Sequence, residues 1–456
     1  MSKNIKQKNP IKKLTEIKSS VFSRSLQVAK FGLSAGLQYA NTKIKNKSID
    51  DFLIAQAENM THELSQLKGS LMKAGQMLSM FGEYFLPPQA NQMLKSLQSD
   101  SIAIDWNTIE SYLKGYLSEE ILKELIIDPE PIGTASLGQV HKAVIKSTGE
   151  VIALKIQYPH VDLAIDSDLS ALKALLKISR LLPAGLDLSS VFEEIKIMLC
   201  QELDYIQEAE TTRQYKALLQ DDPRYIVPKV YPRYSGQKIL ATEYLEGFKA
   251  DHPLIQNLSQ NRRNQLAISF IDLYFKELFD WNLIQTDPHL GNYKVQIDPS
   301  GKSDRLVLLD FGATRKLNTS FMKNYQKMIK ASIENNRELL YEACSNMGFF
   351  IKGDSEEYIK TFIDFCNETV EPFLSFTDPR NTQQHIKSDG TYHWKNTDLP
   401  GRVLKKALQF KKFDLRAPPR DMIFLDRKTG GVFIFLSVLQ AQINARKIID
   451  PYLSRV

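Results

Sequence analysis

The sequence predicts an α+β fold of two lobes, in which a strand-rich region is preceded and followed by long helical regions. Short apolar runs rich in glycine and β-branched residues begin near Asp128 and predict paired strands. Apolar residues at helical spacing dominate the chain before this region and after residue 247. The 456 residues are 43% hydrophobic and 25% charged, a globular composition with room for more than one domain.

Positive charge is concentrated at the start of the chain. Residues 1–50 contain eleven Lys and Arg and only two acidic residues, whereas the whole chain has a net charge of +6. The body therefore has a slight acidic excess, and we expect it to bind no nucleic acid. Cys200, Cys344 and Cys366 are far apart and lack metal-ligand spacing, which predicts a reducing compartment without disulfides or structural zinc.

The basic segment 1–50 is the first predicted part of the chain. An apolar stripe at steps of three and four residues predicts an amphipathic helix, which lies on an anionic membrane surface or packs on the protein body. No apolar run is long enough for a transmembrane helix, and the start lacks the apolar core of a signal peptide. The stripe consists of Phe22, Leu26, Ala29, Leu33, Leu37 and Ala40.

Three further segments follow the basic one. Residues 51–126 predict a helical extension. Residues 127–246 predict a strand-rich lobe, into which the helical stretch 160–190 is inserted. Residues 247–456 predict a mostly helical lobe that two short strands interrupt, at YKVQI and RLVLL.

A glycine-rich turn precedes a predicted hairpin of two strands, GQVHKAVI and EVIALKIQ. The turn keeps the spacing G-x-G-x-x-G-x-V of a phosphate-binding loop, with alanine at the second glycine. Glycines in such a loop let backbone N–H groups approach phosphate oxygens without a Cβ in the way. The candidate nucleotide-binding residues of the turn are Gly133, Ala135, Ser136, Gly138 and Val140.

A lysine follows this turn at the end of an apolar strand. Lys155 lies fifteen residues after Val140 and completes a V-A-I-K pattern. A lysine at this place in a nucleotide-binding lobe neutralises the α- and β-phosphates. We therefore predict that Lys155 is a catalytic and nucleotide-binding residue.

Two acidic motifs complete the predicted site. Asp287 and Asn292 have the D-x-x-x-x-N spacing of a kinase catalytic loop, in which the Asp is the base or orients the nucleophile and the Asn holds a metal. Asp310 begins Asp-Phe-Gly directly after a predicted strand and would bind magnesium. Four motifs in this order predict a two-lobed, protein-kinase-like fold that binds ATP or ADP with Mg²⁺.

The chain departs from ordinary protein kinases at several positions. Gln285 and Thr286 stand where H-R-D kinases have His and Arg, and no A-P-E motif follows Asp310. The platform that holds a peptide substrate is therefore expected to be missing. Between the lobes, the run that contains Glu243 is expected to be the hinge, and its backbone is expected to meet the adenine.

From about Ser65 to its end the chain resembles the UbiB-type, or aarF-domain, atypical kinases of ubiquinone biosynthesis, and most closely their mitochondrial-type members. Lys73 and Gln76 fall in the run KAGQ, which matches the K-x-G-Q motif of that family. Glu202 and Asp204 match its E-x-D motif. The runs LDFGATR and RKTGGVF are also similar, and DPHLGN differs from the bacterial pattern only at Leu290.

The resemblance implies regulatory roles for Lys73, Gln76, Glu202 and Asp204. The helix with Lys73 is expected to lie over the active-site cleft, with Lys73 near the two acidic residues. The resemblance also implies that Glu208 is the helix-αC partner of Lys155, although the sequence alone leaves Glu193 and Glu194 open. Glu202 and Glu208 are about 240° apart around a helix, so they can face two different lysines.

The function that the resemblance implies is an atypical kinase or ATPase activity that supports ubiquinone biosynthesis at a membrane. The expected partners are ATP, an anionic membrane surface, quinone precursors and quinone-biosynthesis enzymes. The expected location is peripheral to the bacterial inner membrane, on its cytoplasmic side, or the matrix side in a eukaryote. The alternatives are a small-molecule or lipid kinase, a nucleotide-gated scaffold that organises the biosynthetic enzymes, and a conventional Ser/Thr kinase.

Overall fold

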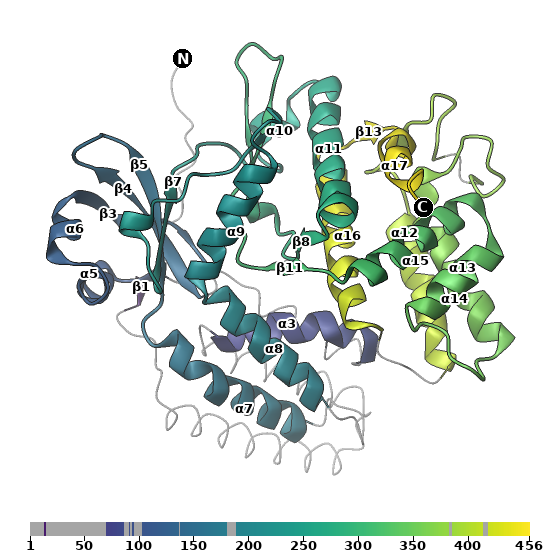
Figure 1. Ribbon diagram of the computed structural model, residues 1–456, viewed down its shortest axis with the longest axis horizontal. Helices are drawn as coiled ribbons and strands as arrows, with labels where there is room; N and C mark the ends of the chain where they lie inside the picture. The colour runs from purple at the N-terminus through teal and green to yellow at the C-terminus, as the bar shows by residue number, and fades with distance from the viewer. Residues whose placement is uncertain are drawn as a thin grey trace, which may run out of the picture. The chain divides into compact units, whose positions relative to one another are not determined.

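The computed structural model describes most of the chain after residue 102 and one helix before it (Figure 1). The predicted helix between Phe22 and Ala40, its membrane contact and Ser136 lie outside the described residues. Within the described residues we find no helix whose length and hydropathy would suffice to cross a bilayer. The described residues are 13–14, 70–85, 91, 94, 103–135, 137–179, 188–382, 385–413 and 418–456.

Two compact units make up the described part of the chain. The first extends to Arg213 and also includes Lys229–Tyr244. The second consists of Gln214–Pro228 and Leu245–Val456.

A four-stranded antiparallel sheet is the centre of the first unit, with the strand order β3-β4-β5-β7. Residues alternate between buried and more exposed along β5, as expected for a strand with one face on the core. The predicted hairpin is confirmed as β4 and β5. The four strands are β3 (Leu125–Thr134), β4 (Gly138–Ile145), β5 (Val151–Gln157) and β7 (Ile239–Glu243).

Helices of the first unit confirm the predicted insertion after β5. The helix α3 (Ser70–Phe85) lies against α7 (Val161–Ser179) and α8 (Ser189–Glu202), as Figure 1 shows. The buried face of α3 includes Leu71, Ala74, Met77 and Leu78. The remaining helices are α5 (Trp106–Lys114), α6 (Glu119–Lys123) and α9 (Tyr205–Leu218), whose last residues belong to the second unit.

A side chain of β4 joins the segment before α5 to the four-stranded sheet. β2 (Ala103–Ile104) runs parallel to β1 (Lys13–Leu14). The buried Gln139 side chain on β4 accepts the Ile104 N–H at 2.8 Å and donates to the Ile104 carbonyl at 3.2 Å. One amide side chain therefore satisfies both backbone groups of Ile104, as burial requires.

Short strands in the second unit surround the predicted catalytic motifs. The predicted strands at YKVQI and RLVLL are confirmed as an antiparallel pair, which the parallel strand β6 extends. Two further antiparallel pairs, β8 with β11 and β12 with β13, are too short to be visible in the sequence. The strands are β6 (Tyr225–Ile226), β8 (Leu283–Gln285), β9 (Tyr293–Gln296), β10 (Arg305–Leu308), β11 (Thr314–Lys316), β12 (Tyr392–His393) and β13 (Gln442–Ile443).

Helices α11 and α16 lie side by side at the core of the second unit (Figure 1). The rings of Phe270 on α11 and Phe435 on α16 stack with their centroids 3.8 Å apart. A π-helical turn, η2 (Lys276–Asp280), continues α11 towards β8. The helices are α10 (Pro253–Gln256), α11 (Gln260–Phe275), α12 (Thr319–Glu334), α13 (Arg337–Asn346), α14 (Glu356–Thr369), α15 (Leu399–Leu408), α16 (Arg420–Val438) and α17 (Ala445–Leu453).

Candidate active site

The glycine-rich turn connects β3 to β4. Gly133 is opposite Val140 in the strand register, and the Ala135 N–H donates to the Gly138 carbonyl at 2.7 Å, which closes the turn. A Cβ at Gly133 would meet no described atom within 4 Å. Because no neighbour in the first unit requires a glycine there, the open space suits the close approach of a ligand oxygen.

Gly138, by contrast, is required by packing. A Cβ at this position would lie 2.4 Å from the Ile156 carbonyl oxygen on β5 and 3.0 Å from the Tyr205 hydroxyl. Any side chain would therefore push β4 away from β5. Gly138 was predicted from the sequence as a phosphate-binding residue, and the packing of β4 against β5 also requires a glycine there.

Lys155 lies in the middle of the sheet, paired with Val140 on β4 and Leu240 on β7. Its Nζ is 2.7 and 2.9 Å from the two carboxylate oxygens of Glu208, which is buried on α9. The Tyr205 ring lies beneath the same ammonium, with its centroid 5.2 Å away. A buried carboxylate and an aromatic face thus fix the position of this cation.

A second lysine–glutamate pair joins α3 to α8. The Lys73 Nζ lies 2.6 Å from Glu202 Oε1, as the resemblance implied. Asp204 is exposed and caps α9, because its Oδ1 accepts the Gln207 N–H at 2.9 Å. Gln76 lies three residues after Lys73 on α3, and its carbonyl accepts the Ser79 hydroxyl.

The predicted hinge follows β7, which ends at Glu243. Glu243 exchanges hydrogen bonds with Lys229: its N–H donates to the Lys229 carbonyl at 2.7 Å, and its Oε2 accepts the Lys229 N–H at 3.1 Å. The chain passes from the first unit to the second between Tyr244 and Leu245. The adenine contact of this segment stays a prediction.

The predicted catalytic loop lies between β8 and β9. The Asp287 carbonyl accepts hydrogen bonds from Gln285 Nε2 at 2.7 Å and from Asn292 Nδ2 at 2.8 Å. Because its amide nitrogen is used in this way, Asn292 presents its side-chain oxygen, which has no protein donor among the described residues. The Leu309 N–H donates to the Asn292 carbonyl at 3.0 Å, which ties this loop to the residue before Asp310.

The oxygen atoms of this part of the second unit fit magnesium. An amide oxygen from Asn292 and a carboxylate from Asp310 are the hard ligands that Mg²⁺ prefers. Asp310 Oδ1 accepts the Gly312 N–H at 3.0 Å, which fixes the carboxylate at the start of its loop. The ring of Phe311 lies 4.6 Å from that of Tyr215, which in turn meets Trp281 edge-on at 5.8 Å.

Arg427 contacts a predicted site residue, Asp287, and the sequence reasoning gave this arginine no role. This arginine on α16 places Nη2 2.5 Å from Asp287 Oδ1. Four residues later, a Cβ at Gly431 would lie 2.2 Å from the Pro288 side chain, so α16 touches the catalytic loop directly. The only available signal was the run RKTGG, since two adjacent glycines inside a helix are unfavourable unless packing requires them.

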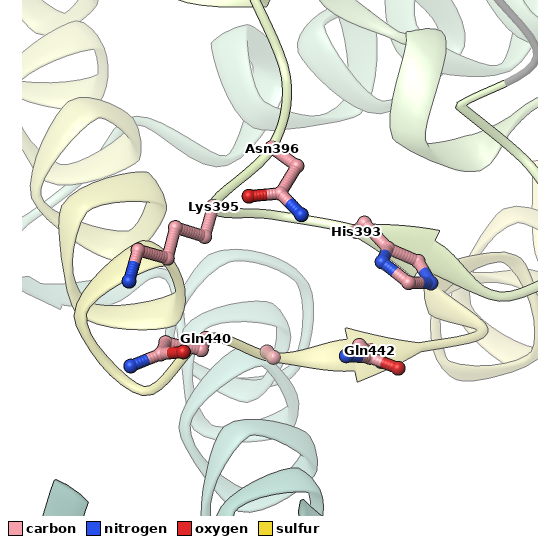
Figure 2. Close-up of a pocket in the computed structure, with 6 residues that line it drawn as sticks. His393, Lys395, Asn396, Gln440 and Gln442 are labelled. Carbon is pink, nitrogen blue, oxygen red and sulfur yellow. The ribbon is translucent and has the colours of Figure 1, made fainter.

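A small polar cavity lies elsewhere in the second unit, beside the antiparallel pair of β12 and β13 (Figure 2). Its volume is about 120 Å³. The lining includes none of the predicted site residues, so this cavity is not the predicted nucleotide site. The lining residues are His393, Lys395, Asn396, Gln440, Ala441 and Gln442.

Comparison with known proteins decides the family. The model of the ABC1 atypical kinase-like domain matches residues 96–344. The chain belongs to this atypical kinase family. The resemblance drawn from the motifs and the predicted kinase-like fold are thereby confirmed, and the matched range contains Lys155, Glu208, Asp287, Asn292 and Asp310.

Several members of the family are similar along most of the chain. The mitochondrial atypical kinase COQ8B of Rattus norvegicus is 30% identical over 405 residues, which are 87% of this chain and 72% of the relative. The mitochondrial atypical kinase COQ8 of Schizosaccharomyces pombe is 28% identical over 397 residues, which are 87% of this chain but only 62% of the relative. The chain therefore spans about three fifths of that yeast protein.

A solved structure shows the same fold. The protein Rv3197 of Mycobacterium tuberculosis, determined as a complex with erythromycin, superposes with a TM-score of 0.58 and 25% sequence identity. The match covers 88% of this chain and 98% of that chain.

Proposed function

We propose that this ABC1-family protein binds Mg-ATP and acts as an ATPase or phosphotransferase that supports ubiquinone biosynthesis at a membrane. The observation that carries the proposal is the contact of Lys155 with both oxygens of the buried Glu208. A lysine that is held in this way on a central strand is the phosphate-binding group of kinase-like proteins. The mitochondrial atypical kinases named above support the same class of activity.

Each predicted residue has a chemical role in this proposal. Lys155 neutralises the phosphates, Glu208 keeps its ammonium in place, and Asn292 and Asp310 supply oxygen ligands for the metal. When bound, Mg²⁺ withdraws negative charge from the phosphate oxygens. Asp287 accepts a hydrogen bond from the nucleophile and holds or takes its proton.

The segment after Asp310 favours a small nucleophile over a protein substrate. Only three residues separate Asp310 from β11, and α12 begins at Thr319. No A-P-E segment follows, and the described chain here offers no extended platform for a peptide. Water is the first candidate nucleophile, and a hydroxyl group of a small molecule or lipid is the second.

The fate of the γ-phosphate tests the proposal. Purified protein is incubated with γ-labelled ATP, Mg²⁺, anionic liposomes and a phenolic quinone-precursor mimic. Free phosphate supports an ATPase, a labelled lipid or phenol supports a small-molecule kinase, and a labelled protein supports a conventional kinase. Nucleotide binding without turnover would reject the ATPase or phosphotransferase and support the nucleotide-gated scaffold. A protein that neither binds nor turns over ATP would reject both.

Two variants separate catalysis from metal binding: Asp287→Asn tests the catalytic step, and Asp310→Asn tests the binding of Mg²⁺. Asp287→Asn should lower turnover by about two to four orders of magnitude with little change in nucleotide affinity. Asp310→Asn should remove the magnesium dependence of the thermal shift with ATP, because one anionic ligand disappears. Liposome sedimentation with and without residues 1–50 tests the membrane contact separately.

A further inference from the structure

Two consecutive residues of α16, Arg427 and Lys428, are linked to Asp287 of the catalytic loop. Arg427 reaches the Asp287 side chain directly, with Nη2 2.5 Å from Oδ1. The two side chains are 18% and 20% exposed, so water screens this ion pair only in part. A planar guanidinium fixes the direction of a carboxylate better than a lysine does.

Lys428 reaches the backbone of Asp287 through a buried chain of polar side chains. Its Nζ is 2.7 Å from Glu277 Oε2 on the π-helical turn, and 3.4 Å from the Tyr293 hydroxyl. That hydroxyl donates to Gln285 Oε1 at 2.9 Å, and Gln285 Nε2 donates to the Asp287 carbonyl at 2.7 Å. Buried polar groups joined in this way hold one another in a single arrangement.

Close packing adds to these contacts. The Thr429 hydroxyl lies 2.6 Å from the Tyr274 hydroxyl on α11. Gly431 lies so close to Pro288 that a methyl group between them would overlap the ring. The residues from Arg427 to Gly431 therefore bind α16 to α11 and to the catalytic loop within little more than one helical turn.

We propose that α16 is the positioning element of the catalytic loop: Arg427 orients the Asp287 carboxylate, while Lys428, Tyr293 and Gln285 hold its backbone. Both contacts are made by unmodified residues, so the loop needs no phosphorylated activation segment to acquire its geometry. The catalytic consequence rests on the function proposed above. The structural consequence, that α16 holds the catalytic loop in place, is independent of that function. The two consequences are therefore tested by separate measurements.

Hydrogen–deuterium exchange tests the structural consequence on the full-length protein. In Arg427→Ala, amides in residues 286–293 should exchange faster than in the wild type. The matched control is Arg262→Ala, because Arg262 forms an ion pair of similar burial with Asp304 at the far end of the β9–β10 hairpin. Unchanged exchange in residues 286–293 of Arg427→Ala would overturn the proposal.

Kinetics test the catalytic consequence. Arg427→Ala should lower kcat on the order of 10- to 100-fold, because a misplaced catalytic group costs about that much. The affinity for Mg-ATP should stay within about twofold, since Arg427 acts through Asp287 and not on the nucleotide. Millimolar guanidinium should restore part of the kcat of Arg427→Ala and none of that of Asp287→Asn, which a loss of folding would not produce.

Tyr293→Phe is the milder variant if Arg427→Ala folds poorly. It removes the hydroxyl that bonds Gln285 and leaves the ring in place, so kcat should fall several-fold at unchanged Mg-ATP affinity. Wild-type kcat in Tyr293→Phe, or equal loss of affinity and kcat in Arg427→Ala, would contradict the proposal. If the wild type shows no turnover at all, the proposed function fails, and the exchange experiment alone decides the role of α16.

Discussion

Two lysine–glutamate pairs in the first unit have nearly equal N–O distances and opposite burial. In the pair on the sheet, Lys155 is 19% exposed and Glu208 only 2%. In the pair between helices, Lys73 is 6% exposed and Glu202 is 16% exposed. In the first pair the cation is the accessible partner, and in the second it is the buried one.

We infer from this difference that Lys155 is the ligand-binding cation and that Lys73 is a structural one. A buried carboxylate that holds an accessible ammonium presents that charge to something outside the pair, such as a phosphate. A buried ammonium that faces a more accessible carboxylate is satisfied within the protein and joins two helices. We therefore expect Lys155 to govern nucleotide affinity and Lys73 to govern the attachment of α3 to α8.

Stability gives the largest expected effect. Lys73→Ala should lower the free energy of unfolding by about 3 kcal/mol, because it leaves Glu202 without its partner in a largely buried place. The matched control is Lys196→Ala, since Lys196 on α8 forms an exposed pair with Asp166 that water screens, and its loss should change stability far less. Chemical unfolding of the wild type, Lys73→Ala and Lys196→Ala measures the loss of stability in each variant. Equal losses in both variants would contradict the structural role of Lys73.

Nucleotide affinity gives the next effect. Lys155→Ala should weaken ATP binding by roughly 1.5–3 kcal/mol, the contribution of hydrogen bonds to a charged group. Lys73→Ala should leave the dissociation constant nearly unchanged. The control on the neighbouring strand is Lys142→Ala, whose ammonium lies 4.7 Å from the Tyr244 ring centroid. Titration calorimetry would contradict our interpretation if Lys73→Ala lost as much affinity as Lys155→Ala.

Charge reversal sharpens the same contrast. The double variant Lys73→Glu/Glu202→Lys should recover about 1 kcal/mol of the stability that either single change removes, because the pair is restored with its polarity inverted. Lys155→Glu/Glu208→Lys should recover no ATP affinity, since a carboxylate would then stand on the strand where the phosphates need a cation. Recovery of ATP affinity in the second double variant would show that only the net charge matters.

A third pair, Lys428–Glu277, gives the smallest effect and has both partners buried. Burial raises the pKa of Glu277, an effect that Lys428 opposes only in part. The folded protein therefore binds the Glu277 proton more tightly than the unfolded chain does. The stabilisation that this tighter proton binding gives is complete below about pH 4.3, the pKa of an unperturbed Glu. It is lost as the pH rises through the raised pKa of the folded protein. In unfolding experiments, the stability of the wild type relative to Glu277→Gln should fall as the pH increases from 4, and a rise would refute this assignment.

The strands and motifs near Lys155 could be predicted because they depend on local patterns. Alternating apolar residues predict β5, and the glycine-rich turn before β4 predicts the hairpin. Glu208 needed the family resemblance, because Glu193 and Glu194 lie on a helix of similar pattern and the ion pair spans 53 residues. Asp204 also has a local function that the sequence could indicate: an Asp just before a helix is a favourable cap, and it serves α9 in that way. Its regulatory role stays a prediction.

The contacts of α16 could not be predicted, because they join residues 140 apart in the sequence. Nothing local distinguishes Arg427 from the many solvent-exposed arginines of amphipathic helices. The buried pair of Lys428 and Glu277 is equally hidden, since its glutamate lies on a π-helical turn that no periodic pattern predicts. Only the adjacent glycines mark α16 as a helix with a close neighbour.

The contact of Phe311 with Tyr215, and of Tyr215 with Trp281, also gives the protein a built-in optical reporter. The chain has three tryptophans, and Trp106 and Trp394 lie beside other rings, those of His141 and Phe433. A variant with Trp106→Phe and Trp394→Phe retains one indole, two ring contacts away from the Asp-Phe-Gly motif. Its emission would report any change in the packing of Phe311 against Tyr215 when nucleotide is added, without any attached dye.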